Sequence, residues 1–75
     1  MNQFMMWWDN NKKTTLTSKI EHAVEYYHKK YGNKPTLCYV NPAVLKKEIT
    51  IDNLKVRPYR PVLLGHLWIG IEENE

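Results

Sequence analysis

Residues 4–8 read Phe-Met-Met-Trp-Trp, five large apolar side chains in a row in a chain of 75 residues. The run has the length of a typical strand and falls far short of the roughly 20 residues that span a bilayer. In a strand, Phe4, Met6 and Trp8 would point to one side and the residues between them to the other. Both sides are apolar, so the segment predicts a strand that needs shelter from water on both faces.

The clearest periodic pattern lies at residues 16–31, where apolar residues recur every three or four positions and so share one face of a helix. These residues are Leu16, Ile20, Ala23, Val24, Tyr27 and Tyr31. Thr14 or Thr15 can cap the start, because a side-chain oxygen there accepts a backbone N–H that lacks a partner. Ser18-x-x-Glu21 is an alternative capping box, which would start the helix three residues later.

Three further segments have the pattern of strands. Residues 36–40 form a short apolar run bounded by prolines, which predicts a buried strand. Residues 48–57 alternate on both sides of Asp52-Asn53, and because both turn residues tolerate a positive φ, the segment predicts a hairpin with a type I′ turn. Residues 66–72 alternate again and predict the last strand.

These segments predict one domain, residues 1–75, of the α+β class. Gly32 can adopt the left-handed conformation that ends a helix, which separates the helix from the strands that follow. We expect one amphipathic helix packed on a small antiparallel or mixed sheet of about four to five strands, in the order β-α-β-β-β.

Alternation divides the predicted sheet into two faces. The apolar residues that we expect to meet the helix are Ile49, Ile51, Leu54, Val56, Leu67, Ile69 and Ile71. The opposite face then carries Lys55, Arg57, Tyr59, His66 and Trp68. On that face Trp68 is a large aromatic residue that needs cover.

Three arrangements would shelter residues 4–8. The segment can be an interior strand whose second face meets Trp68, it can pair or pack with a second copy of the chain, or it can dock on a different protein. Full burial of such side chains is worth about 1.5–3 kcal/mol each. We favour self-association, because a single helix covers only one face of a sheet, and Trp, Tyr and Met are enriched in interface cores. The expected interaction residues are Phe4, Met5, Met6, Trp7, Trp8 and Trp68.

The charge distribution suggests a second function. The chain carries a net charge of +3, and all eleven Lys and Arg residues lie between Lys12 and Arg60, together with only four acidic residues. Aromatic rings that stack on bases beside cations that hold phosphates would bind single-stranded nucleic acid. The residues suited to that role are Lys55, Arg57, Tyr59, Arg60 and His66. The competing interpretation is an ordinary lysine-rich surface exposed to solvent.

Catalysis and metal binding have little support in the sequence. His22, His28, His66 and Cys38 are the only soft metal ligands, and no two histidines have the i, i+4 spacing that places both on one helix face. Cys38 and His66 could form a nucleophilic pair, but burial in an apolar strand would leave the thiol inert. We therefore expect no catalytic residues, no metal and no cofactor.

The composition also bears on location. The single cysteine cannot form an intramolecular disulfide, which fits a reducing cytoplasm. The first residues lack the positive charge of a signal peptide. We expect a soluble cytoplasmic protein that forms homodimers or binds a protein partner, with no membrane association.

Two stretches resemble segments of short, uncharacterised prokaryotic proteins encoded in chromosomal or mobile-element open reading frames. They are YYHKKYGNKPTLCYVNP, residues 26–42, and VLLGHLWIGIEE, residues 62–73. No activity is established for such proteins, so the resemblance implies an α+β fold and a prokaryotic or phage origin but no functional site.

Overall fold

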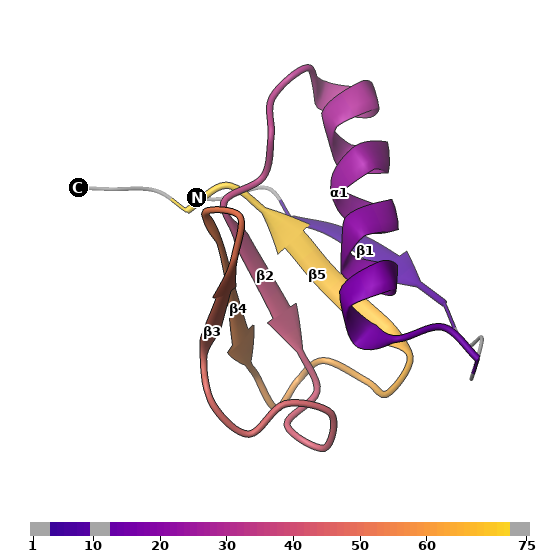
Figure 1. Cartoon of the computed structure of the whole chain (residues 1–75), viewed down its shortest axis with the longest axis vertical. Coiled ribbons are helices and arrows are strands. Elements are labelled where there is room, and N and C mark those ends of the chain that lie inside the picture. Colours follow the sequence, from indigo (N-terminus) through magenta and orange to yellow (C-terminus); the bar gives the residue numbers. More distant parts are fainter. Residues whose placement is uncertain (1–3, 10–12, 73–75) are drawn as a thin grey trace.

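The computed structural model describes residues 4–9 and 13–72, which form one helix and five strands (Figure 1). In chain order the elements are β1 (Phe4–Trp8), α1 (Leu16–Tyr31), β2 (Leu37–Val40), β3 (Ile49–Ile51), β4 (Leu54–Pro58) and β5 (His66–Gly70). The α+β class is confirmed. The element order is β-α-β-β-β-β, and all five strands lie in segments predicted from the sequence; the predicted order β-α-β-β-β is one strand short of those segments.

The five strands form one mixed sheet in the order β1-β5-β2-β4-β3, with α1 across one face (Figure 1). β2 and β4 are parallel, and the other neighbouring pairs are antiparallel. β1 and β2 therefore run in the same direction with β5 between them. β1 lies at an edge of the sheet, so an interior position for residues 4–8 is wrong.

Local capping fixes both ends of α1. Thr15 is the N-cap, and its Oγ1 accepts a hydrogen bond from the Ser18 N–H at 3.1 Å. The alternative start at Ser18 is therefore wrong. At the other end Gly32 has φ +80°, and its N–H donates to the His28 carbonyl at 2.8 Å. A residue with a Cβ is strained at that φ, which explains why glycine ends this helix.

The hairpin between β3 and β4 has the predicted turn. Asp52 and Asn53 have φ values of +47° and +70°, as a type I′ turn requires. The turn sets the register, in which Ile51 lies opposite Leu54 and Ile49 lies opposite Val56.

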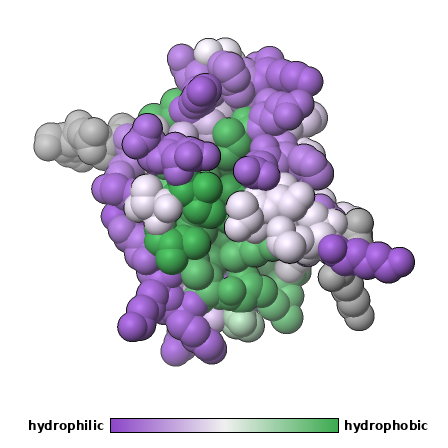
Figure 2. Space-filling view, in the orientation of Figure 1, coloured by the Kyte–Doolittle hydropathy of each residue, from purple (hydrophilic) through white to green (hydrophobic). Residues whose placement is uncertain are grey.

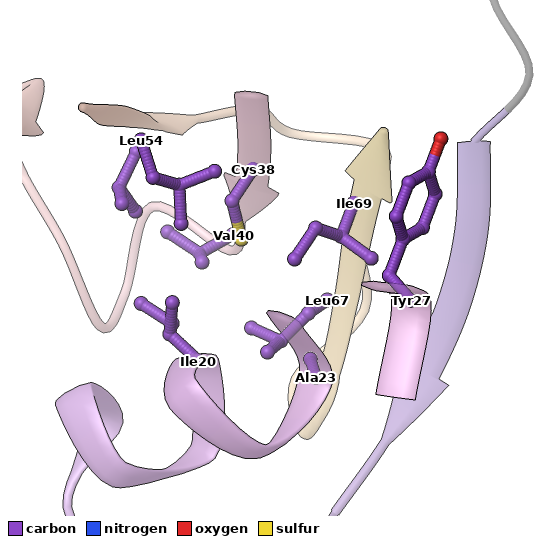
Figure 3. Packing of buried hydrophobic residues seen from close by; sticks show 9 residues of the cluster. Ile20, Ala23, Tyr27, Cys38, Val40, Leu54, Leu67 and Ile69 are labelled. Carbon is purple, nitrogen blue, oxygen red and sulfur yellow. The ribbon is translucent and has the colours of Figure 1, made fainter. Parts of the chain in front are cut away.

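The hydrophobic core lies between α1 and the sheet (Figure 3). Its buried members are Ile20, Ala23, Tyr27, Cys38, Val40, Leu54, Val56, Leu67 and Ile69. Met5 and Trp7 of β1 pack against this cluster from the edge.

Three residues expected in the core are instead exposed: Tyr31, Ile49 and Ile71. Ile71 follows β5, which ends at Gly70 rather than at the predicted residue 72. Ile49 belongs to β3, the strand farthest from β1 and β5. A helix about 10 Å wide spans roughly two strand spacings, so one helix leaves the far edge of a five-stranded sheet uncovered.

Within the described part of the chain, α1 is the one helix, and it is too short and too polar to cross a membrane.

Candidate interaction surface

The face of the sheet opposite α1 carries most of the residues that the sequence singled out, and we call it the open face. Strand alternation and register place the following residues on it: Phe4, Met6, Trp8, Leu37, Tyr39, Lys55, Arg57, Tyr59, His66 and Trp68. Among residues 4–9 and 13–72, the single helix lies on the other side of the sheet.

Aromatic side chains form a continuous cluster on the open face. The Tyr39 ring centroid lies 5.5 Å from that of Phe4 and 4.7 Å from that of Tyr59. The Tyr59 ring in turn meets Trp68 edge-on at 5.7 Å. The sequence predicted that Tyr59 and Trp68 share a face. It missed Tyr39, whose strand β2 lies between β4 and β5 and links the two rings.

Residues 4–8 divide between the two faces as alternation predicts. On the helix side, the Trp7 ring lies 5.2 Å from Tyr26 of α1, so this side of the segment is sheltered. On the open face, Phe4 is half-buried against Tyr39, whereas Met6 is 67% exposed and Trp8 is 60% exposed. The chain therefore covers the helix side of β1, whereas on the open face it covers only Phe4.

None of the described strands pairs with the outer edge of β1. The Asp9 N–H donates to the Gly65 carbonyl at 2.9 Å, which continues the pairing between β1 and β5. Hydrogen-bonded pairs occur at every second residue of an antiparallel ladder. Asp9, Trp7 and Met5 therefore direct their backbone N–H and C=O groups at β5. The residues whose N–H and C=O groups point outward are Phe4, Met6 and Trp8. None of the strands that the structure describes lies beyond them.

The opposite edge of the sheet differs in kind. β3 has only three residues and follows Lys46, Lys47 and Glu48, all exposed. Short edge strands with flanking charges discourage pairing between molecules. β1 has five residues, none of them charged and none proline, and a single charged residue, Asp9, directly follows it.

The part of the open face over β4 is charged rather than aromatic. Arg57 donates from Nε to Glu48, and its Nη1 lies 3.6 Å from a carboxylate oxygen of Glu72. Lys55 Nζ lies 3.4 Å from the other oxygen of Glu72. The hydrogen bond with Glu48 raises the pKa of Arg57 above its usual value. Two cations thus face two carboxylates, and the formal charge of this cluster is zero.

The residues proposed for nucleic-acid binding are only partly brought together. Lys55, Arg57, Tyr59 and His66 share the open face, but Arg60 lies in the loop after β4. His66 is near the β1 side, where its ring lies 6.2 Å from that of Trp8. The sequence did not reveal that Glu48 and Glu72 would neutralise the two strand cations.

The structure separates the nucleophilic pair that the sequence offered, Cys38 and His66. Cys38 is fully buried on the helix side of β2, and burial raises the pKa of its thiol to about 12. His66 belongs to the open face, so the two side chains lie on opposite sides of the sheet and cannot act as a pair. Among the residues that the structure describes, no group of three His, Cys, Asp or Glu residues could hold a metal ion.

A hollow of about 400 Å³ lies on the other side of the sheet, between α1 and the β3–β4 hairpin. Its apolar lining includes Ile20, Val24, Ile51 and Leu54, and apolar surface is visible in this region in Figure 2. None of the residues expected to bind a protein or nucleic acid lines it.

No protein-family model matches the chain, and neither a curated protein nor a solved structure shows significant similarity to it. The resemblance to short prokaryotic proteins therefore remains a prediction.

Proposed function

We propose that this chain is a non-catalytic interaction module that forms a homodimer by antiparallel pairing of β1 with β1 of a second copy. One observation carries the proposal: β1 is an apolar edge strand with exposed side chains and outward-pointing backbone groups. A strand edge of this kind is a template for pairing with another chain.

The register of such a dimer follows from which residues point outward. Centred on Met6, the pairing places Met6 opposite its counterpart and Phe4 opposite Trp8 of the second copy. All three residues offer outward N–H and C=O groups, so every pair can form both of its hydrogen bonds. The two sheets then join into one sheet of ten strands. The exposed side chains of Met6 and Trp8 gain neighbours across the new junction.

Proline at position 6 tests the pairing directly. The Met6 N–H points away from β5, so Met6→Pro removes a donor from the intermolecular ladder and none from the β1–β5 ladder. Proline is tolerated in an edge strand when its missing N–H faces outward. We expect the unchanged chain to sediment as an oligomer and Met6→Pro to sediment as a monomer that retains its circular dichroism spectrum. Analytical ultracentrifugation at several protein concentrations measures this difference.

Thr50→Pro is the matched control. Thr50 is the middle residue of β3, at the other edge of the sheet. Its two neighbours, Ile49 and Ile51, form the hydrogen-bonded pairs with β4. Its N–H also points outward, so this proline carries the same local cost. We expect Thr50→Pro to leave the oligomer unchanged. A monomeric wild-type chain at tens of micromolar would contradict the proposal, and so would a Met6→Pro chain that still forms the dimer.

Binding of single-stranded nucleic acid is the second candidate, supported by the aromatic cluster of Tyr39, Tyr59 and Trp68 on an open sheet face. The paired cations Lys55 and Arg57 support it less, because Glu48 and Glu72 already neutralise them. Titration with a short oligonucleotide at two salt concentrations distinguishes the cases. Genuine binding quenches tryptophan emission and weakens steeply as salt rises, since phosphate contacts release counterions. We expect no quenching at low salt; salt-sensitive quenching would favour this candidate instead.

A further inference from the structure

We propose that two β1-paired dimers pack open face to open face, so that four copies of the chain form a two-layered assembly. This proposal rests on the proposed dimer and identifies what binds to its open face, which is a second dimer of the same chain. The inference starts from the symmetry of the pairing. Antiparallel strands that pair edge to edge are related by a two-fold axis perpendicular to the sheet. The two copies of α1 therefore lie on one side of the ten-stranded sheet, and the two open faces lie together on the other.

The pairing doubles an apolar patch that is exposed at Met6 and Trp8 and half-buried or buried elsewhere. In each copy, the aromatic half of the open face spans β1, β5 and β2, and β1 lies at the centre of the dimer. Exposed side chains lie in and beside this half, including Met6, Trp8 and Tyr59. The joined patch is six strands wide and about five residues long, or about 29 Å by 17 Å. The footprint of the joined patch is therefore about 490 Å².

The area also fits a face-to-face contact. Two such patches packed together bury about 1,000 Å², which reaches the lower limit of a specific protein–protein interface. One chain alone offers half that area and falls below the limit. Face-to-face packing of sheets is therefore expected for dimers and not for single chains, which links the second contact to the first.

The charges around the patch favour another copy over a charged partner. In the assembly, each end of the aromatic patch is flanked by the cluster of Lys55, Arg57, Glu48 and Glu72. Because each cluster contains two cations and two carboxylates, the clusters of two facing dimers do not repel each other through net charge. A polyanion would gain no net attraction from this neutral cluster, which makes nucleic acid a poorer fit to the same surface.

Tyr59→Lys tests the face without touching the β1 edge. Tyr59 is 42% exposed at the end of β4, two strands away from β5 and three from β1. We expect the unchanged chain to sediment at the mass of four 9.0 kDa copies and Tyr59→Lys to sediment at the mass of two. Tyr59→Phe keeps the ring and should keep the larger mass. Acrylamide should quench the tryptophans more strongly in Tyr59→Lys than in the unchanged chain, since Trp8 and Trp68 belong to the buried face.

The outcomes separate this proposal from the one that it rests on. A wild-type chain that stays at the mass of two copies over the whole concentration range overturns the four-copy assembly and leaves the β1 dimer intact. A wild-type monomer overturns both. A Tyr59→Lys chain that is folded and still sediments as four copies shows that another surface makes the second contact. Should Tyr59→Lys lose its native circular dichroism, Tyr59→Ser provides the same comparison without the added charge.

Discussion

Replacing Ile69 with alanine is expected to lower the free energy of unfolding by about 2–5 kcal/mol. Ile69 is fully buried in β5, the strand that contacts both β1 and β2, and its side chain points at α1 (Figure 3). Alanine removes apolar contacts and leaves a cavity that the surrounding strands cannot close. A domain of this size has a total stability of about 4–11 kcal/mol, so the substitution should remove a large fraction of that stability.

Ile71→Ala is the matched control for this prediction. The same side chain, two residues later, lies beyond the end of β5 and is 37% exposed. Its loss should cost much less than that of Ile69. Urea unfolding followed by circular dichroism at one fixed protein concentration compares the two, since the stability of an associating chain depends on concentration. Equal destabilisation by both substitutions would mean that the core does not lie where the structure has it.

Truncation of the two neighbouring tryptophans of β1 should change the free energy of unfolding by very different amounts. Trp7 packs against Tyr26 and the core, so Trp7→Ala should cost about 3 kcal/mol, near the low end for a large aromatic residue because the ring is only partly buried. Trp8 is 60% exposed on the open face, and Trp8→Ala should change the stability of the single chain by about 0.5 kcal/mol or less. Urea unfolding at low protein concentration, where association contributes least, measures both.

Trp7→Phe separates the ring of Trp7 from its indole N–H. The Nε1 atom is buried and has no hydrogen-bond partner among the described residues. A buried donor without a partner is costly, so its removal partly offsets the smaller ring. Trp7→Phe should therefore be far less destabilising than Trp7→Ala. If the two variants unfold at the same urea concentration, the ring does not make the packing contacts described above.

Local signals predicted the elements well because short-range chemistry determines them. Thr15 and Gly32 satisfy backbone groups at the ends of α1, and Asp52-Asn53 adopts the positive φ values that the turn needs. Each of these effects depends on residues a few positions apart. Alternation of polar and apolar residues likewise identified the strands at residues 48–57 and 66–72, whereas β1 and β2 were identified as continuous apolar runs.

The strand order could not be predicted in the same way. Alternation states which face a side chain occupies but not which strand lies beside it. β5 lies between β1 and β2, and β2 pairs in parallel with β4, so both arrangements join segments that are distant in the sequence. The edge position of β1 and the linking role of Tyr39 follow from that order, and the sequence alone could not supply them.

The candidate surface was predictable in composition but not in charge. The sequence placed Lys55, Arg57 and Tyr59 on one face, and the structure keeps them there. It did not indicate that Glu48 and Glu72, nine or more residues away from their partners, would meet the two cations. Lys55 and Arg57 of the predicted basic surface therefore belong to a neutral cluster of ion pairs.

The pairing of β1 with β5 also affects how the molecule is made. β1 is translated well before β5, the strand with which it pairs, Phe4 with Gly70 and Trp8 with His66. At roughly 5–20 residues per second, translation leaves residues 4–8 without their intramolecular neighbour for several seconds. During that interval, two nascent chains translated from the same mRNA would each expose the apolar segment of residues 4–8. Co-translational assembly and chaperone binding would then compete for residues 4–8 before β1 pairs with β5 of its own chain.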